Sequence, residues 1–296
     1  MTVKTICILM PGDMGHGVGK VLRDHGYETI TALDGRSART KALAELGELR
    51  DVGSFDAAVG EADMILSILP PVEATNQATA VADAMKRVGK SPVYVDCNAI
   101  STGTAIDVGN IVTAAGAPFI DAGIIGLTPS KSKNTQFYVS GADTAPMMEL
   151  SGKGFKVIDL GTEPGRASTF KMVYAAFTKG SWTLWTALLL AAERNNLLPE
   201  LIEQFEHSQS DMLKKMRGKV PFLPADSARW VGEMQEIAKT FREAGVHGGF
   251  HDGAAWVFEL LSETPFAEET RENMDTNRTL EDSLKVYAEA LAKRGA

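Results

Sequence analysis

The start of the chain joins a short apolar run to a turn that contains glycine. Residues 3–9 are largely apolar, and Met10-Pro11-Gly12-Asp13-Met14-Gly15 follows them directly. A strand that enters a glycine turn and then a helix presents backbone N–H groups and a helix dipole to a pyrophosphate. Gly12 would let the main chain approach the phosphates, and Gly15 would let the helix pack closely on its strand. Met10 replaces the first glycine of the G-x-G-x-x-G pattern, so the turn alone is an incomplete dinucleotide signature.

The first 160 residues alternate strand and helix patterns. Short apolar runs predict strands at Val3–Leu9, Glu28–Leu33, Asp63–Leu69, Val93–Cys97, Pro118–Ala122, Gln136–Ser140 and Phe155–Leu160. Helical stretches lie between most of them, at Gly15–Asp24, Ser37–Leu46, Val72–Val88 and Thr104–Ala114. Gly26 and Gly89 fall where two of these helices should end. The alternation predicts an α/β domain of Rossmann type, with a doubly wound, mainly parallel sheet.

The character of the sequence changes after Gly161. One segment, from Ala167 to Asn195, is rich in Ala, Leu, Phe and Trp and contains no proline. As a helix at 1.5 Å per residue it would extend roughly 40 Å. The rest reads as further helices, separated by Pro199, Pro221–Pro224, Gly245–Gly249 and Pro265. We therefore expect a dinucleotide-binding domain over residues 1–163, followed over 164–296 by a long connecting helix and an all-α domain.

Composition excludes several classes of function. The formal charge of −8 argues against a nucleic-acid surface, which requires a basic patch. No apolar run reaches the about 18 residues that a membrane span needs, and the chain starts directly with a strand rather than a signal peptide. Cys7 and Cys97 fall inside predicted buried strands, as inert thiols of a reducing compartment do. The histidines show no metal-ligand spacing. We expect a cytoplasmic protein with no metal, membrane or nucleic-acid partner.

The second predicted strand ends in residues that bear on cofactor choice. Asp34 lies about 20 positions beyond the glycine turn, where an acidic residue binds the adenosine ribose and favours NAD. Arg36, Ser37 and Arg39 favour NADP, because an Arg beside a hydroxyl suits a 2′-phosphate. Asp34 and Ser37 can instead cap the next helix. We expect NADP, with NAD as the alternative, and a nicotinamide lying near Leu69-Pro70.

The long helix carries the best candidate for a catalytic group. Lys171, Ala175 and Lys179 share one helical stripe, and Tyr174 lies beside it. The neighbouring side chains are mostly apolar, which predicts that Lys171 is partly buried. Burial lowers the pKa of a lysine, so that it exchanges protons near neutral pH. Hydride transfer from an alcohol carbon requires a group that takes the hydroxyl proton, and Lys171 is the candidate.

The ordered set of segments resembles the β-hydroxyacid dehydrogenase superfamily, which includes 3-hydroxyisobutyrate, tartronate semialdehyde and 6-phosphogluconate enzymes. The glycine turn, Leu69-Pro70, a D-x-S-T-like segment at Asp96, a second glycine segment and the lysine of the long helix occur in the family order. The resemblance implies a Rossmann-type domain plus a helical domain, with Lys171 as general acid/base. It also places Asp96 and Asn98 on the substrate-binding segment.

This chain departs from the family pattern at several substrate positions. Asn98-Ala99 replaces the usual Ser-Thr, Ile125-Gly126-Leu127 replaces Ser-Gly-Gly, and Ala175 replaces an asparagine. We therefore expect a substrate that is larger or less acidic than hydroxyisobutyrate. Residues 230–234, Trp-Val-Gly-Glu-Met, resemble a less characterised branch with its own C-terminal helical domain. The residues expected to bind substrate are Asn98, Ser101, Gly126, Tyr174 and Lys179.

The expected function is NAD(P)-dependent hydride transfer between a nicotinamide and a secondary alcohol, hydroxyacid or ketone of low molecular weight. Imine reduction on the same architecture is one alternative, although the resemblance implies that imine reductases lack the lysine found at position 171. A catalytically silent nucleotide-binding scaffold is another, suggested by Met10 and the altered substrate segments. The apolar long helix leads us to expect a homodimer.

Overall fold

The computed structural model of the protein describes residues 3–270 and 273–295. The chain divides into two compact units, Met1–Met172 and Val173–Ala296. The division falls inside the long helix α7 (Arg166–Arg194), whereas the expected domain boundary at residue 163 lies before it. The first turns of α7 therefore belong with the sheet.

The first unit contains an eight-stranded sheet in the part of the chain that the structure describes, with the order β3-β2-β1-β4-β5-β6-β7-β8. Neighbouring strands are parallel except for the antiparallel pair β6 and β7. The mainly parallel, doubly wound sheet is thus confirmed. The strands are β1 (Thr5–Leu9), β2 (Glu28–Thr31), β3 (Arg50–Asp51), β4 (Met64–Ser67), β5 (Val93–Asp96), β6 (Phe119–Ile125), β7 (Gln136–Ser140) and β8 (Lys156–Asp159).

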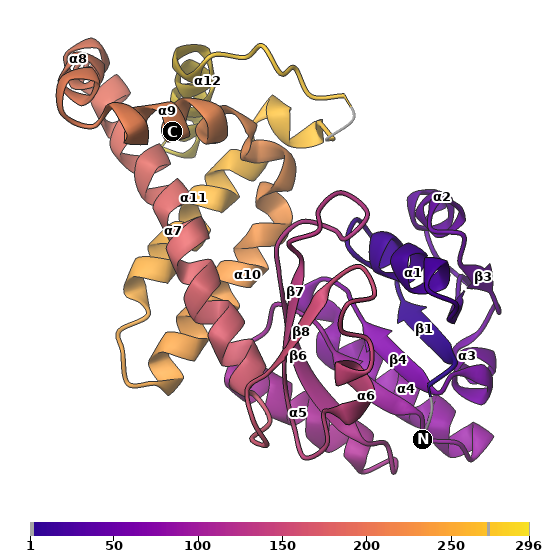
Figure 1. The fold of residues 1–296 in the computed structure, drawn as a ribbon. Coiled ribbons are helices and arrows are strands. Elements are labelled where there is room, and N and C mark those ends of the chain that lie inside the picture. The colour runs from indigo at the N-terminus through magenta and orange to yellow at the C-terminus, as the bar shows by residue number, and fades with distance from the viewer. Residues whose placement is uncertain (1–2, 271–272, 296) are drawn as a thin grey trace. The chain divides into compact units, whose positions relative to one another are not determined.

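Helices cover both faces of this sheet (Figure 1). One apolar cluster includes residues of α1 and α2, and another includes residues of α3, α4 and α5. Gly89 ends α4 in the left-handed conformation, as its position predicted. Three further elements, β3, α3 and α6, have no strong pattern in the sequence and were not predicted. The helices are α1 (Gly15–Asp24), α2 (Ala38–Leu46), α3 (Phe55–Glu61), α4 (Ala74–Val88), α5 (Thr102–Thr113) and α6 (Ala145–Met148), with a 3₁₀ turn at Pro71–Glu73.

The second unit is helical in its described residues, as expected. Beyond α7 it contains α8 (Leu198–Ser208), α9 (Ser210–Lys219), α10 (Pro224–Glu243), α11 (Gly249–Ser262) and α12 (Leu280–Arg294), with 3₁₀ turns at Val220–Phe222 and Pro265–Glu268. Trp230 of α10 packs between Trp182 of α7 and Phe258 of α11, at ring-centroid distances of 5.3 and 5.1 Å. These rings contribute to the core of the unit. Over residues 3–270 and 273–295, no helix has the length and apolarity needed to cross a membrane.

Candidate active site

The strand order places a ligand crevice beside β1. The chain leaves β1 for α1, which packs with one apolar cluster, and leaves β4 for α4, which packs with the other. Beyond the carboxyl ends of two such strands the loops diverge, and open α/β sheets bind ligands at this switch point. The glycine turn follows β1, Leu69-Pro70 follows β4, and Asp96 ends β5. The fold therefore brings three of the predicted segments to one edge of the sheet.

Met10, which stands in place of the first glycine of the turn, has a left-handed backbone. Met10 has φ 59°, a left-handed conformation that glycine adopts at little cost. A Cβ built on Gly15 would lie 3.1 Å from Cγ2 of Ile8, which confirms that this glycine permits close packing of α1 on β1. A Cβ built on Gly12 would meet nothing within 4 Å, so the main chain there borders open space.

His16 supports this turn and was not singled out from the sequence. Its ring is buried, and Nδ1 lies 2.8 Å from the carbonyl oxygen of Gly12, to which it donates. No side chain caps the N-terminus of α1 at Met14. Of the first backbone N–H groups of α1, that of His16 donates to the carbonyl oxygen of Gly12 at 3.1 Å. A helix N-terminus without a side-chain cap suits an anion such as a dinucleotide pyrophosphate.

Ser37 and Arg39, which were expected to favour NADP at the adenosine end, both make contacts within the protein. Ser37 accepts a hydrogen bond from the Thr40 N–H at 3.2 Å and therefore caps α2. Arg39 pairs with Asp13 of the glycine turn at 2.6 Å. The capping interpretation of Ser37 is thus confirmed, and any phosphate contact would be additional to it.

Arg36 lies between two helices of the same unit, while Asp34 is exposed. The Arg36 guanidinium donates to Oε1 of Gln77 at 3.1 Å and lies 5.5 Å from the ring centroid of Phe55. Partial burial lowers the pKa of Arg36, and the charge of Glu73 opposes that shift. Its Nε is buried and has no hydrogen-bond partner within the described residues.

Asn98 ties together the ends of β4 and β5. Its Oδ1 accepts from the Leu69 N–H at 2.8 Å, and its Nδ2 donates to Ser67 Oγ at 3.0 Å and Asp96 Oδ2 at 2.8 Å. Both N–H groups of the amide are therefore engaged within the protein. A substrate contact by Asn98 stays a prediction, and it would have to use the remaining lone pair of Oδ1.

Ser101 and Gly126 each have a structural role. Ser101 is fully buried and caps α5 by accepting a hydrogen bond from the Thr104 N–H at 3.2 Å. Gly126 follows β6 with φ 115°, a conformation that favours glycine. A substrate contact by either residue stays a prediction.

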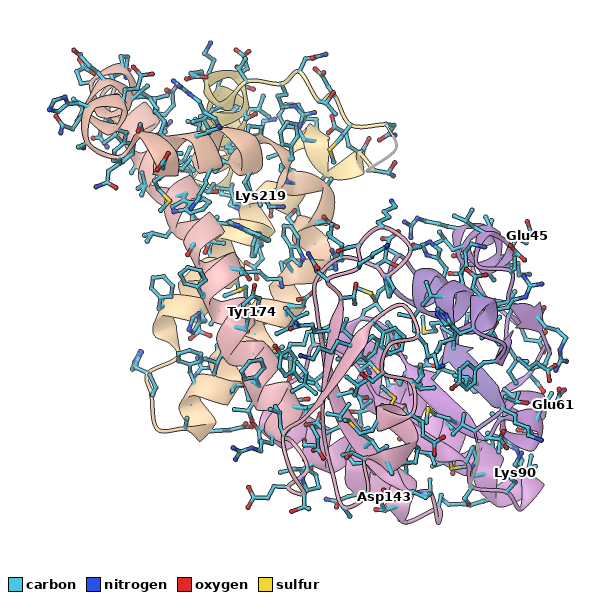
Figure 2. All side chains as sticks on the ribbon, viewed as in Figure 1. Glu45, Glu61, Lys90, Asp143, Tyr174 and Lys219 are labelled. Carbon is cyan, nitrogen blue, oxygen red and sulfur yellow. The ribbon has the colours of Figure 1, made fainter. Side chains whose placement is uncertain are left out.

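Tyr174 and Lys179 belong to the second unit, whereas Lys171 belongs to the first. Figure 2 shows Tyr174 on the long helix, and its side chain is 48% exposed. Lys179 Nζ pairs with Glu233 at 2.8 Å, and both side chains are largely buried. Lys179 also lies 6.0 Å from the ring centroid of Trp230. The ion pair with Glu233 compensates for the burial of the Lys179 charge inside the helical unit.

Lys171 is half-buried, as predicted. Its helical neighbours Phe170, Val173 and Phe177 are themselves 40, 53 and 75% exposed. The sheet covers one side of the lysine. A Cβ built on Gly123 of β6 would lie 2.8 Å from Cβ of Lys171 and 2.9 Å from the carbonyl oxygen of Ala167. Gly123 thus lets α7 rest directly on β6.

Asp121 fastens the first turn of α7 to the same strand. Its carboxylate accepts from Ser168 N at 3.0 Å, Ser168 Oγ at 2.5 Å and Ser140 Oγ at 3.1 Å. Ser140 Oγ in turn accepts from the Ala167 N–H at 3.0 Å. Burial raises the pKa of Asp121, and these donors oppose that rise. No local sequence pattern indicates this cap, because its partners lie far apart along the chain.

Comparison with known families identifies the first unit. Residues 5–158 match the NAD binding domain of 6-phosphogluconate dehydrogenase, which is more than half of the chain. The protein belongs to this family. Residues 192–261 match a domain of unknown function, DUF1932, which fits the predicted branch with its own helical domain. The resemblance inferred from the ordered motifs is therefore confirmed.

Individual relatives agree with this assignment. An uncharacterized 28.5 kDa protein of Methanothermus fervidus is 26% identical over 200 residues, which cover 67% of this chain and 74% of the relative. The conserved protein MTH1747, of unknown function and structurally similar to 3-hydroxyacid dehydrogenases, is 25% identical with a TM-score of 0.65. That match covers 88% of this chain and 97% of the other.

Two enzymes share the fold at lower identity. The 3-hydroxyisobutyrate dehydrogenase of Mycobacterium tuberculosis has a TM-score of 0.68 at 17% identity, and the match covers 100% of both chains. A reductive aminase of Aspergillus terreus, solved with NADPH and ethyl-5-oxohexanoate, has a TM-score of 0.55 at 16% identity, covering 88% of this chain and 93% of the other. The protein thus has the NAD(P)-binding, hydroxyacid dehydrogenase-like fold that both enzymes share.

Proposed function

We propose that the protein is an NAD(P)-dependent oxidoreductase that transfers hydride between a nicotinamide and a secondary alcohol, hydroxyacid or ketone, with Lys171 as general acid/base. The observation that carries this proposal is the placement of Lys171. Gly123 and Asp121 hold the first turns of α7 on β6, so that Lys171 lies near the carboxyl end of β5. In an open α/β sheet the ligand crevice lies outside these strand ends.

The residues of the first unit fit a dinucleotide. Gly12 to Gly15 would bind the pyrophosphate, because the main chain at Gly12 borders open space and no side chain caps α1. Arg36 and Ser37 would bind the adenosine end, and Leu69-Pro70 would border the nicotinamide. A bound nicotinamide supplies the acceptor or donor of hydride. We propose NADP as the cofactor, with NAD as the alternative, because Arg36 directly precedes Ser37 in the sequence and an Arg next to a hydroxyl side chain suits a 2′-phosphate.

Lys171 would accept the hydroxyl proton of an alcohol during oxidation and return it during reduction. Ile125 and Leu127 stand where the family pattern has serine and glycine, and Leu127 is 60% exposed. Apolar side chains at these positions favour a substrate that is bulkier than hydroxyisobutyrate. Short 3-hydroxy acids should therefore be turned over less well than bulky secondary alcohols.

The direct test is to titrate the protein and its Lys171→Ala variant with NADPH and with NADH, with fluorescence as the readout of binding. Both proteins are then assayed for turnover of alcohols and ketones. We expect micromolar binding that survives the substitution and a loss of about 10²–10⁴-fold in kcat. Lys156→Ala, an exposed lysine on β8, is the control and should leave both unchanged. Unchanged turnover in Lys171→Ala would refute the assignment, and the absence of nucleotide binding would favour the silent-scaffold alternative.

Imine reduction is the second candidate, favoured by the shared fold of the reductive aminase. It is tested in the same assay by adding an amine to each ketone. If turnover occurs with the amine and persists in Lys171→Ala, imine chemistry replaces alcohol chemistry as the conclusion.

We also propose that the protein is a homodimer that associates through the second unit. Between residues 173 and 192 the sequence has a single charged side chain, Lys179, and it pairs with Glu233. The exposed face of α7 is therefore uncharged over about 30 Å. Phe250 of α11 extends this face, since a Cβ on Gly180 would lie 3.2 Å from its ring. We call the exposed residues Val173, Tyr174, Phe177, Leu184 and Phe250 the α7 patch.

The area of the α7 patch suits a second copy of the chain. Its exposed fractions run from 48 to 75%. With about 200 Å² for each aromatic side chain, the patch offers roughly 500 Å² of apolar surface. Two copies would bury about 1,000 Å² from these side chains alone, the lower bound of a specific interface. Symmetric self-association is the commonest assembly for such a face.

Light scattering after gel filtration tests the dimer. Phe177→Asp should reduce the mass from dimer to monomer, because it would bury a charge at the centre of the interface. Val72→Asp is the matched control, since Val72 is 70% exposed in the first unit, and it should leave the dimer intact. A monomeric parent protein, or a Phe177→Asp variant that remains dimeric, would refute this surface.

A further inference from the structure

Four polar residues lie side by side across the middle of the sheet. The strand register pairs Ser67 of β4 with Asp96 of β5, Asp96 with Asp121 of β6, and Asp121 with Ser140 of β7. All four side chains are fully buried. Residues paired in register point to the same face of a sheet, with neighbouring strands about 4.8 Å apart. We call Ser67, Asp96, Asp121 and Ser140 the polar row.

The two carboxyl groups of the polar row have unequal support. Asp121 accepts three hydrogen bonds, and two come from the first turn of α7, where the helix dipole favours negative charge. Asp96 accepts two, both from Asn98. Two adjacent buried carboxylates cannot both ionise at low cost. Asp96 is therefore the member of the pair whose charge changes readily.

The first turns of α7 cover the face of the sheet to which the polar row points, because Asp121 accepts from Ser168 N and a Cβ on Gly123 of the same strand would lie 2.8 Å from Cβ of Lys171. Asp96 is paired with Asp121 and points to that face, so its charge acts on Lys171.

The titratable groups that act on Asp96 or respond to it are Asp121, Lys171, Tyr94 and Cys97. Burial raises the pKa of Tyr94 and of Cys97, so both stay neutral. Burial and the charge of Asp121 raise the pKa of Asp96 to about 7, against the opposing effect of Asn98 and of the Lys171 ammonium.

We propose that Asp96 is a positioning residue that acts through Lys171: its carboxylate favours the ammonium form of the lysine and so sets the pH range in which Lys171 accepts a proton. The proposal rests on the proposed role of Lys171 as general acid/base. It gives a function to the buried carboxyl of Asp96, which has no other role in the proposed reaction. Linkage makes the effect reciprocal, so loss of the ammonium must make Asp96 harder to ionise.

The first test is the pH profile of kcat/KM for alcohol oxidation, which rises as Lys171 loses its proton. Asp96→Asn should shift the acidic limb to lower pH by about one unit, because a nearby carboxylate has been removed. Ser67→Ala removes an acceptor of the same network without changing charge, and it should leave the limb in place. A purely structural role for Asp96 would lower activity at every pH without moving the limb.

The outcomes separate this proposal from the proposed function. If Lys171→Ala does not reduce turnover, the acid/base assignment itself fails. If Lys171 is required but the limb is unmoved in Asp96→Asn, the positioning role is overturned and the proposed function stands.

A second measurement does not depend on the folding of the Asp96 variant or on activity. Carbon-13 NMR of the full chain, labelled at aspartate carboxyls, should show one carboxyl that titrates near neutrality, far from the ordinary value of about 3.9. In Lys171→Met, which keeps most of the aliphatic stem and loses the charge, its midpoint should rise. An unchanged midpoint would overturn the proposal.

Discussion

Replacing Gly12 with alanine separates the fold from the dinucleotide site. A Cβ on Gly12 meets nothing within 4 Å, and the residue does not need a positive φ. The free protein should therefore tolerate the methyl group. Alanine also restricts the unfolded chain, so we expect a gain in the free energy of unfolding of about 0.4–1 kcal/mol.

The same substitution should weaken the binding of NADPH. If the pyrophosphate lies against the main chain at Gly12, the methyl group displaces it and weakens a hydrogen bond from a backbone N–H to a charged oxygen. Such bonds contribute about 1.5–3 kcal/mol, and each 1.4 kcal/mol or so corresponds to a tenfold change in affinity. We expect Kd for NADPH to rise by about 10- to 100-fold while the fold becomes no less stable.

The assay pairs urea unfolding with fluorescence titration of NADPH. Gly253→Ala is the matched control, because a Cβ on Gly253 of α11 also meets nothing within 4 Å. It should stabilise the helix by up to about 1 kcal/mol and leave Kd unchanged. An unchanged Kd in Gly12→Ala would refute the placement of the pyrophosphate at Gly12. A marked loss of stability would refute the conclusion that the main chain at Gly12 borders open space.

Three further substitutions test other features. Gly123→Ala would bring a Cβ to 2.8 Å from Cβ of Lys171, so urea unfolding should show a loss of about 1–3 kcal/mol, and an unchanged stability would argue against close contact between α7 and β6. Met10→Gly removes the strain of a methionine in the left-handed conformation, which costs about 1–2 kcal/mol. Glycine also gives the unfolded chain more conformational freedom, so the net gain in unfolding free energy should stay below about 1 kcal/mol. A loss of stability would show that Met10 is not strained. Burial lowers the pKa of His251 below its ordinary value, so the unfolded chain binds the proton more readily than the folded one. The free energy of unfolding should therefore fall as the pH drops below about 6.5, by at most about 1.4 kcal/mol per pH unit. In unfolding curves at pH 7.5 and 5, His251→Phe should reduce this pH dependence, and an unaltered dependence would assign it to other groups.

Local patterns predicted the regular elements because each depends on nearby residues. Gly15–Asp24 is helical, and Gln136–Ser140 is a strand, within the bounds that their periodicity indicated. Elements with a weak local signal were missed. Strand Arg50–Asp51 has two residues, both exposed, and helix Phe55–Glu61 has only seven. Neither is long enough to display a hydrophobic period.

The apolar neighbours of Lys171 on its helix predicted that the lysine is partly buried, and it is half-buried. They did not predict what covers it, because Phe177 is 75% exposed and the lysine packs against the sheet at Gly123. A helical pattern shows which residues share a face, but it does not show what covers that face. The contact with Gly123 joins residues far apart in the chain, and no local pattern encodes it.

The sequence alone determined the class of fold, the glycine turn and the lysine on the long helix, because periodicity and turn chemistry act over a few residues. It also carried the family, through the order of its segments. The tertiary structure decided the left-handed Met10, the Asn98 bridge and the polar row. Ser67, Asp96, Asp121 and Ser140 become neighbours through the register of four strands. Register depends on how whole strands pair, and a shift of one residue would turn each of these side chains to the other face of the sheet.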